Sequence, residues 1–223
     1  MRLVYQDYNF MAEISQGEIT VIIAENPKTF CDFVSNIQEM IEVKGEKVLL
    51  TDDSGEVISK DRCDIILSPM DFQLNSKKIL NSIYKETIQI IKEELWMQEQ
   101  ELYNLLTDFL DRAVMKLPYE LIYERNIDTQ DLLKLCKLSL LESYELLLEK
   151  LTNYVKIISQ VCFTKCLFLV NIHDFLSVQE LEMLYETAIY SDVNLILIES
   201  HQREKPSYEH TYILDDSNCL IEF

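Results

Sequence analysis

Glycine and basic residues are scarce in this sequence. Its 223 residues include 3 glycines, and 20 Lys+Arg stand against 39 Asp+Glu, which gives a formal net charge of -19. A loop that cradles nucleotide phosphates needs glycines, because they let backbone N–H groups approach the phosphates closely. A nucleic-acid backbone attracts basic surfaces and repels acidic ones. Composition therefore disfavours both a nucleotide-phosphate loop and generic nucleic-acid binding.

Signals for a membrane segment or a metal cluster are lacking as well. No run of about 18 apolar residues occurs, and no apolar signal-peptide core follows the first residues. We therefore expect a cytoplasmic protein without a membrane partner. The six cysteines form no CxxC pair and the three histidines lack zinc-finger spacing, so buried thiols explain the cysteines better than a zinc site does.

The pattern that is present is that of an α/β protein. The chain is 48% hydrophobic, enough for a folded core. Helices are predicted over 28–43 and from a capping box at Ser177 to 190. Apolar and β-branched runs predict strands, including those of two hairpins, within 3–5, 10–14, 19–24, 47–58, 63–69, 165–171, 194–200 and 211–223. Continuous apolar strands separated by helices favour a parallel sheet.

In the middle of the chain the apolar spacing changes to that of helices. A pattern from Asn75 to about Leu117 contains no Pro or Gly and would form a rod about 60 Å long, which must protrude or bend. Helical patterns at 129–137 and 142–159 are expected to fold back along it as an antiparallel bundle. We therefore predict two domains, an α/β domain of 1–72 with 160–223 and an inserted α-helical domain of 73–159.

The stretch ITVIIAENPKTFCDFVSNI, from Ile19 to Ile37, reads as a strand, a tight turn and an amphipathic helix. Phosphate-binding α/β proteins begin in this way, but they place glycines and a Gly-Lys-Ser/Thr in the turn. Here the turn is ENPKT, in which only Lys28 and Thr29 match that pair. An ordinary strand-to-helix turn is the better interpretation, so no nucleotide is expected.

Other candidates for chemistry are few. His173 and His201 follow two buried strands, where α/β ligand sites often lie, but solvated loop histidines are the plainer interpretation and we predict no catalytic residue. The acidic residues Glu120, Glu124 and Asp128 lie in an irregular connection, where bends can direct several oxygens at one calcium ion. From spacing alone, a solvated acidic loop is the better interpretation, since no EF-hand pattern is present.

Four stretches of the chain together resemble a known family. They are TVIIAENPKTFCDFV, ELIYE, LFLVNIHDFLSVQELEMLYETAIYSDVNLILIES and YILDDSNCLI. In order and nearly in spacing they are similar to the short subfamily of the subtype II-A CRISPR-associated adaptation protein. That family forms a small ring that binds DNA ends and is encoded beside the RNA-guided effector nuclease. The resemblance covers almost the whole chain, and no single motif in it is catalytic.

The resemblance implies a degenerate P-loop-like α/β head with an inserted α-helical leg. It also implies a homotetramer, a dimer of dimers, that threads linear double-stranded DNA through a positively lined hole without catalysis. Calcium near the junction of head and leg is implied, with Glu120 and Glu124 as ligands and Asp128 as a weaker match, because the sequence around Arg125 departs from the family pattern. Partners implied in spacer acquisition are other CRISPR adaptation proteins, the integrase and the effector nuclease.

Assembly of this kind would resolve the conflict with the net charge. Of the 20 Lys+Arg, 11 fall within 73–158, and a ring would gather them on one inner surface while calcium neutralises acidic clusters. The plainer interpretation is that these basic residues lie on the solvent-exposed faces of long helices. The lysines predicted to contact DNA are Lys28, Lys77, Lys78, Lys85, Lys134, Lys137, Lys150 and Lys156.

Two other functions stay open at this point. One is a nucleotide-dependent ATPase or kinase-like enzyme on the same fold, which the glycine-poor turn disfavours. The other is a protein-docking scaffold whose acidic surface binds basic partners without binding DNA.

Overall fold

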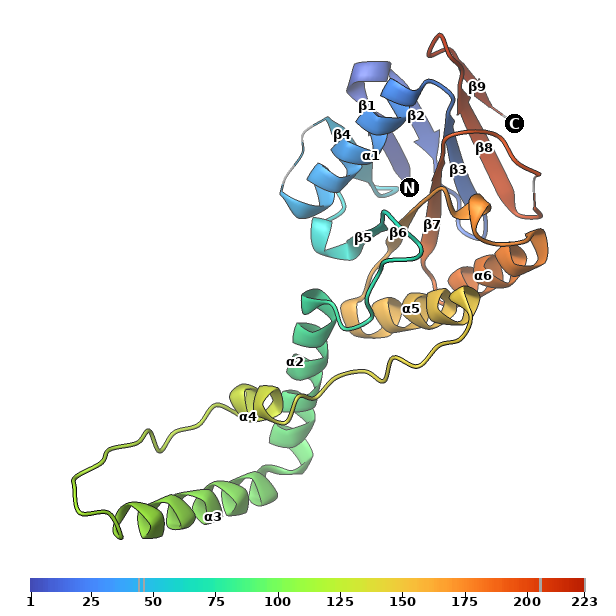
Figure 1. The fold of residues 1–223 in the computed structure, drawn as a ribbon. Coiled ribbons are helices and arrows are strands. Elements are labelled where there is room, and N and C mark those ends of the chain that lie inside the picture. The colour runs from blue at the N-terminus through green and yellow to red at the C-terminus, as the bar shows by residue number, and fades with distance from the viewer. Residues whose placement is uncertain (44, 46, 205, 223) are drawn as a thin grey trace. The chain divides into compact units, whose positions relative to one another are not determined.

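A computed structural model of the chain describes residues 1–43, 45, 47–204 and 206–222 (Figure 1). The chain divides into two compact units. Met1–Leu74 and Glu142–Phe223 together form the first, here called the α/β unit, and Asn75–Leu141 forms the second, here called the helical unit. The helical unit is therefore an insertion in the sequence of the α/β unit, as the apolar spacing predicts.

A six-stranded sheet is the centre of the α/β unit, with the strand order β5-β6-β7-β3-β8-β9. Neighbouring strands run parallel except for β9, which pairs antiparallel with β8. The strands are β3 (Ile19–Ala24), β5 (Cys63–Ile66), β6 (Cys166–Val170), β7 (Asn194–Glu199), β8 (Glu209–Leu214) and β9 (Leu220–Glu222). Every residue of β3 and β6 is buried, because layers cover both faces of the sheet.

One face of this sheet packs against α1 (Pro27–Glu42) and a small antiparallel sheet of order β2-β1-β4. The small sheet consists of β1 (Arg2–Tyr5), β2 (Phe10–Glu13) and β4 (Val48–Thr51). Phe33 and Ile37 of α1 share one core with Leu3 of β1 and with Ile22 and Ile198 of the large sheet. The amphipathic helix predicted after the first buried strand is therefore confirmed, with the apolar face directed at the sheet.

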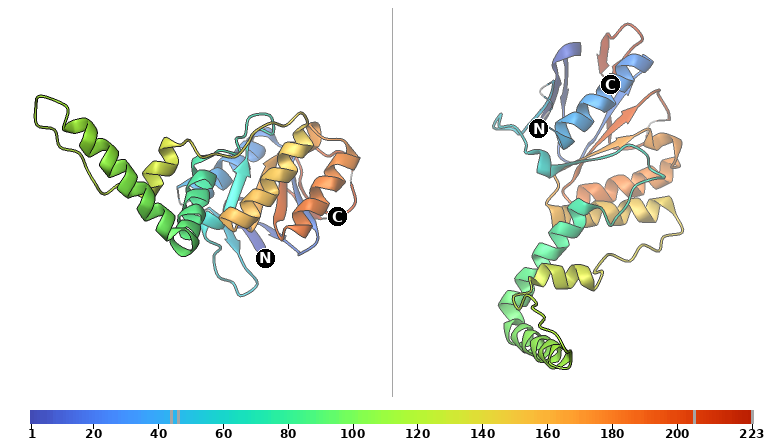
Figure 2. Two further views of the ribbon diagram at one scale, coloured as in Figure 1. Left: turned by 90° about the horizontal axis from the view of Figure 1, so that it is seen from below. Right: turned by 60° about the vertical axis from the view of Figure 1, so that its left-hand side comes forward.

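The other face of the large sheet is covered by α5 (Leu147–Cys162) and α6 (Val178–Tyr190), which lie side by side (Figure 2). The predicted capping box opens α6, since the Ser177 hydroxyl accepts from the Glu180 N–H and the Glu180 carboxylate accepts from the Ser177 N–H. Short 3-10 turns complete the unit at η1 (Gln6–Tyr8), η2 (Lys60–Arg62) and η3 (Ile172–Asp174).

The helical unit contains α2 (Lys77–Glu94), α3 (Trp96–Val114) and α4 (Thr129–Leu135). The long helix expected from the sequence is therefore bent at Leu95, whose φ of -120° and ψ of 17° leave the helical region. Leu95 still donates to Ile91 O at 2.9 Å and accepts from Glu99 N at 2.9 Å. The chain changes direction there without losing these two backbone hydrogen bonds.

The ends of the helical unit are joined by its own polar contacts. Asn75 Nδ2 donates to Leu140 O at 3.0 Å, and Asn75 Oδ1 accepts from Leu140 N at 2.8 Å. The Tyr84 hydroxyl donates to Leu138 O at 3.1 Å. One side chain at the start of the unit therefore holds the backbone at its end.

Two expectations about the organisation differ from the structure. The second boundary falls between 141 and 142 rather than at 159, because the apolar side of α5 is buried within the α/β unit, where α5 contacts α6. The predicted helix at 142–159 is therefore part of the α/β unit and not of the inserted bundle. The predicted hairpin at 47–58 is reduced to β4 and a single bridge between Thr51 and Val57 in the described residues.

Within the described ranges, no helix combines the length and apolar character that a bilayer crossing requires.

Candidate functional site

The turn between β3 and α1 stands where a phosphate-binding protein would hold its ligand. Asn26 Oδ1 accepts from Lys28 N at 2.9 Å and from Thr29 N at 3.4 Å, which caps α1. The Thr29 hydroxyl donates to Asn218 Oδ1 at 2.6 Å, and Asn26 Nδ2 donates to Asp216 O at 3.2 Å. The helix N-terminus is thus satisfied by its own cap and by the turn between β8 and β9, an arrangement that disfavours a bound phosphate.

A buried polar cluster lies where β6 and β7 end. His173 Nε2 lies 2.9 Å from Glu209 Oε1 and 3.1 Å from the Tyr185 hydroxyl, which donates to Glu209 Oε1 at 2.6 Å. The side chains of His173 and Glu209 are 5% and 3% exposed. The expectation that His173 is solvated is therefore wrong, because α6 covers the loop that carries it. His201 is partly exposed and lies 3.5 Å from Asp174.

Glu199, the last residue of β7, belongs to the same cluster. Its side chain is fully buried, Oε1 accepts from His173 N at 3.3 Å, and Oε2 has no hydrogen-bond partner among the described atoms. Burial raises the pKa of the Glu199 carboxyl group to about 7, although the charge of His173 opposes the shift. Burial alone would lower the pKa of His173, but the hydrogen bond to Glu209 and the carboxylates of Glu199, Glu209 and Asp174 raise it overall.

The pKa values of Glu199 and His173 in this cluster are raised, but the cluster does not form a recognisable catalytic set. Its polar groups are turned toward one another, and the nearest hydroxyl, that of Tyr185, has a pKa raised far above its usual value by burial and by Glu209. A nucleophile with an adjacent base and a place for substrate is the arrangement that acyl or phosphoryl transfer requires. The cluster therefore gives no support for an enzymatic function.

The predicted DNA-contacting lysines are divided between the two units. Five belong to the helical unit, namely Lys77, Lys78, Lys85, Lys134 and Lys137, and three belong to the α/β unit, namely Lys28, Lys150 and Lys156. The helical unit carries 9 Lys+Arg against 11 Asp+Glu, whereas the rest of the chain carries 11 against 28. The insertion is thus nearly neutral, and the α/β unit accounts for most of the negative charge.

These lysines differ in their exposure and in the contacts that their ammonium groups already make. Lys77, Lys85 and Lys137 are exposed and make no ion pair with a described residue. By contrast, Lys134 is paired with Asp131 at 3.1 Å. Lys150 donates to Phe72 O and lies 4.2 Å from the centre of the Phe72 ring, so its charge already serves the interior of the α/β unit. A phosphate would have to displace these contacts to reach Lys150.

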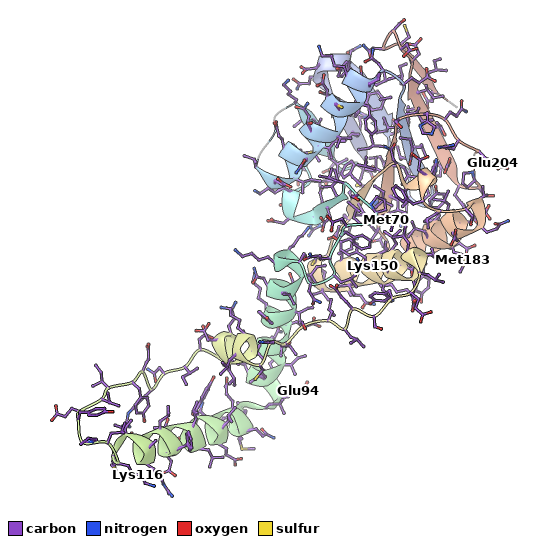
Figure 3. All side chains as sticks on the ribbon, viewed as in Figure 1. Met70, Glu94, Lys116, Lys150, Met183 and Glu204 are labelled. Atoms are coloured by element: carbon purple, nitrogen blue, oxygen red, sulfur yellow. The ribbon has the colours of Figure 1, made fainter. Side chains whose placement is uncertain are left out.

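Two further lysines of the helical unit were absent from the predicted set. Lys92 is exposed on α2, and Lys116 is exposed just beyond α3 (Figure 3). Neither forms an ion pair in the described part of the chain. The helical spacing of α2 could have pointed to Lys92, which follows Lys85 by two turns on one side of the helix.

The predicted calcium ligands are not brought together. Glu120 and Glu124 are exposed in a segment without regular structure, and Asp128 Oδ1 accepts from Gln130 N at 3.0 Å as the cap of α4. Among the described residues, no three His, Cys, Asp or Glu side chains are placed to hold a metal ion. Calcium coordination takes six to eight oxygens, so this arrangement of one chain does not fit the ion.

Other contacts hold this acidic connection on α3. Asp111 Oδ1 accepts from the Tyr123 hydroxyl at 2.7 Å and from Arg125 Nη2 at 2.9 Å. Thr129, at the start of α4, donates to Glu99 and lies 3.1 Å from the Tyr103 hydroxyl. The departure from the family pattern around Arg125 therefore has a structural use, because Arg125 ties the connection to Asp111.

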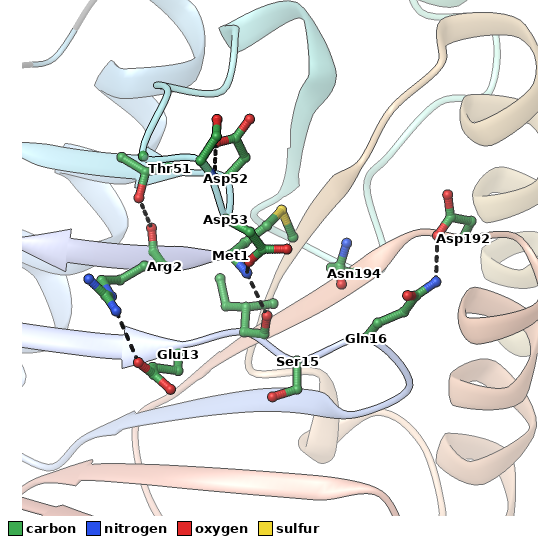
Figure 4. A pocket seen from close by; sticks show the side chains of 13 residues that line it. Met1, Arg2, Glu13, Ser15, Gln16, Thr51, Asp52, Asp53, Asp192 and Asn194 are labelled. Carbon is green, nitrogen blue, oxygen red and sulfur yellow. Dashed lines mark hydrogen bonds and ion pairs between the residues drawn. The ribbon is translucent and has the colours of Figure 1, made fainter.

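A cavity of about 800 Å³ lies at the opposite end of the large sheet from the turn at Asn26 (Figure 4). The N-terminal ammonium of Met1 donates to Asp53 at 2.7 Å, and Arg2 pairs with Glu13 at 3.1 Å. Gln16 donates to Asp192 at 3.3 Å. The acidic lining is thus largely satisfied from within and is unsuited to phosphate.

Comparisons with known proteins agree with this fold. The family described as CRISPR-associated protein (Cas_Csn2) matches residues 40–218. Nothing among curated protein sequences matches the chain. A solved structure titled "Crystal structure of Stu0660 of Streptococcus thermophilus" is similar with a TM-score of 0.65 and 15% sequence identity, over 100% of this chain and 76% of that chain. At this identity the likeness shows the fold, an α/β body with a largely parallel sheet and a helical insertion.

Proposed function

The chain belongs to the Csn2 family of CRISPR-associated proteins, and from that premise we propose that it binds linear double-stranded DNA without catalysing a reaction. The binding unit is a homotetrameric ring, a dimer of dimers, that holds DNA ends during spacer acquisition. Its further partners are the integrase and the effector nuclease of the same system. Binding is independent of base sequence, because phosphates rather than base edges are contacted.

The charge distribution is the observation that carries DNA binding. Nine of the 20 Lys+Arg lie in the helical unit, where only 11 of the 39 Asp+Glu are found. Exposed ammonium groups at Lys77, Lys85 and Lys137 are not neutralised by a described carboxylate. Several copies of such a unit around one duplex would add their fields, whereas the acidic α/β units would remain away from the phosphates.

The absence of catalysis is supported by the turn that follows β3. The N–H groups of Lys28 and Thr29 are bound by the Asn26 side chain, and the Thr29 hydroxyl is bound by Asn218. A magnesium nucleotide needs these groups and a glycine-rich loop. Losing the cap would also cost about 1 kcal/mol, so the fold favours the closed, nucleotide-free turn.

Assembly is supported by the apolar side of α3. None of its 19 residues is buried, and its apolar residues Leu102, Leu105 and Phe109 are 45%, 70% and 67% exposed. Fully burying a side chain of this size contributes about 1.5–3 kcal/mol. An amphipathic helix with this much uncovered apolar surface is best explained by contact with further copies of the chain.

Calcium enters the proposal as a component that is added or removed in the DNA-binding experiment. Because Glu120, Glu124 and Asp128 form no metal-binding group among the described residues and Asp128 serves as a cap, no step of DNA binding is assigned to the ion. If calcium binds at all, neighbouring copies must supply some of its ligands. A double variant Glu120→Gln and Glu124→Gln that keeps the full calcium response would remove these residues as ligands.

A gel-shift experiment tests the proposal directly. A linear duplex and a covalently closed circle of the same sequence are mixed with the protein, with calcium or with a chelator. We expect retention of the linear duplex alone, and a steep loss of binding as salt rises. Equal retention of both forms would contradict threading, and no retention of either form in any calcium concentration would favour the protein-docking scaffold.

The enzymatic alternative is tested separately by a thermal shift with magnesium-ATP. The closed turn at Asn26 predicts no change in Tm. A clear rise in Tm at millimolar nucleotide, reversed by Asn26→Ala or by chelation of magnesium, would favour the ATPase or kinase-like function.

A further inference from the structure

Cys63 and Cys166 occupy matching positions at the starts of two neighbouring strands. They are register partners in the parallel pairing of β5 with β6. Adjacent strands lie about 4.7–4.9 Å apart, which falls inside the range of Cα separations that a disulfide spans. Paired residues on adjacent strands direct their side chains to the same face of the sheet, and both cysteines belong to one buried core.

The surroundings of this pair are apolar and rich in sulfur. Cys63 is 1% exposed and Cys166 is fully buried, and both belong to the core beneath α1. The Cys166 thiol also contacts Met1, with 3.9 Å between the two sulfur atoms. The interaction with the Cys63 side chain, and after it burial, raise the pKa of the Cys166 thiol far above its usual value.

Access differs between the two cysteines. Cys63 lies on β5, the edge strand of the sheet, and lines an apolar cavity of about 320 Å³ together with Met40, Val48 and Leu50. Cys166 lies on β6, which is paired on both sides by β5 and β7. A small uncharged oxidant can therefore reach Cys63 first, and Cys166 is placed to react second.

We propose that Cys63 and Cys166 form a reversible intramolecular disulfide when the protein meets a peroxide. The Cys63 sulfur attacks one peroxide oxygen, the O–O bond breaks, and a sulfenic acid and one water are formed. The Cys166 sulfur then attacks the sulfenic sulfur, the S–S bond forms and the second water leaves. Two thiols are oxidised by two electrons in total, one peroxide is reduced to two waters, and both thiol protons end in water.

The position of the pair in the chain gives this bond a consequence. Cys63 precedes the helical unit in sequence and Cys166 follows it. The disulfide would therefore join the two passes of the chain between which Asn75–Leu141 is inserted, and it would prevent β5 from separating from β6. A closed loop of about 100 residues restricts the unfolded chain strongly, so the oxidised protein should be more resistant to unfolding.

The test uses the full chain with the other cysteines replaced, so that only the pair reacts. This background carries Cys31→Ser, Cys136→Ser, Cys162→Ser and Cys219→Ser, and the matched controls add Cys63→Ala or Cys166→Ala. Each protein is treated with hydrogen peroxide, alkylated, digested without reductant and analysed by mass spectrometry. Wild-type protein receives the same treatment, so that the result does not depend on the folding of any variant.

We expect a peptide linked through Cys63 and Cys166, its loss on adding dithiothreitol, and a rise in Tm of about 5–10 °C that reverses with it. Both single controls should show neither the linked peptide nor the rise. Recovery of Cys63 and Cys166 as unlinked alkylated thiols, in wild type as in the background, would overturn the proposal. Overoxidation of Cys63 to a sulfinic acid without linkage would overturn it equally.

Discussion

The buried carboxyl group of Glu199 makes the stability of the α/β unit depend on pH. Its Oε2 has no partner among the described atoms, and its pKa is raised to about 7 by burial. In the unfolded chain a glutamate has a pKa of about 4.3. Between these values the folded protein binds the extra proton, so stability is highest at low pH within the window and falls as pH rises through it.

We therefore expect Glu199→Gln to flatten the pH profile of stability. Relative to this variant, wild type should lose free energy of unfolding between about pH 4.5 and pH 7, by about 4 kcal/mol at most, and then no further through this group. The raised pKa of His173 acts in the same direction, since its stabilisation is lost as pH rises through the folded value.

Urea unfolding followed by circular dichroism at several pH values measures this difference. Glu204→Gln is the matched control, because Glu204 is an exposed carboxylate in the segment that follows β7. A wild-type profile that runs parallel to that of Glu199→Gln from pH 5 to pH 8 would show that Glu199 is not protonated in the fold.

Among the elements, α3 leaves several of its large apolar side chains exposed in the single chain. None of its residues is fully buried, and the described contacts that α3 makes are with α2 and through polar links such as that of Tyr123 to Asp111. Helices in proteins draw most of their stability from packing of the apolar face. This helix is therefore the element in which a second copy should be detectable.

Substituting Leu105→Glu together with Phe109→Glu should dissociate the assembly with little loss of monomer stability. Both side chains are more than half exposed in the single chain, so introducing charge costs little until another copy must cover them. We expect the dissociation constant to rise more than tenfold, since each lost contact is worth about 1.5–3 kcal/mol. Sedimentation velocity provides the measurement.

A control for this experiment lies on the polar side of the same helix. Gln100→Glu adds a negative charge at an exposed position of α3 and should leave the assembly unchanged. Dissociation caused equally by Gln100→Glu would assign the effect to net charge rather than to the apolar side of α3.

The lysines of α2 should act as phosphate contacts. Replacing Lys77→Ala and Lys85→Ala removes two exposed ammonium groups, and we expect the salt dependence of DNA affinity to fall by about one unit of slope for each. The control is Lys47→Ala, because Lys47 lies in the α/β unit and is already paired with Asp7 at 2.8 Å. Identical slopes for all three proteins, measured by fluorescence anisotropy, would remove α2 from the DNA-contacting surface.

At the scale of the whole molecule, the net charge of -19 opposes the gathering of several chains around an anionic polymer. Repulsion between exposed charges is screened over about 8 Å at physiological salt. The proposed ring therefore requires that DNA be contacted by the nearly neutral helical units rather than by the acidic α/β units.

Sedimentation with and without calcium, and with and without a linear duplex, tests this whole-molecule arrangement. We expect a tetramer whose population rises with the duplex present. A monomer under every condition would contradict the ring. A tetramer that forms equally in the presence of a chelator would show that assembly does not need calcium. The gel shift would then test DNA binding separately.

The sequence alone determined the order of elements and the absence of a phosphate loop. Continuous apolar runs such as Ile19–Ala24 predict buried parallel strands, because burial on both faces leaves no reason to alternate. The capping box at Ser177 and the glycine-free turn at Asn26 each depend on residues a few positions apart, so the sequence alone predicts them.

The tertiary structure alone decided where the long helical pattern breaks, which unit α5 joins, and which charged groups are already engaged. Apolar spacing marks a face but not its partner, so the apolar side of α5 was assigned to the insertion although it packs in the α/β unit. Lys150 and Phe72, or His173 and Glu209, are far apart in sequence and meet only through packing. Contacts of this kind depend on the three-dimensional path of the chain, which periodicity does not record.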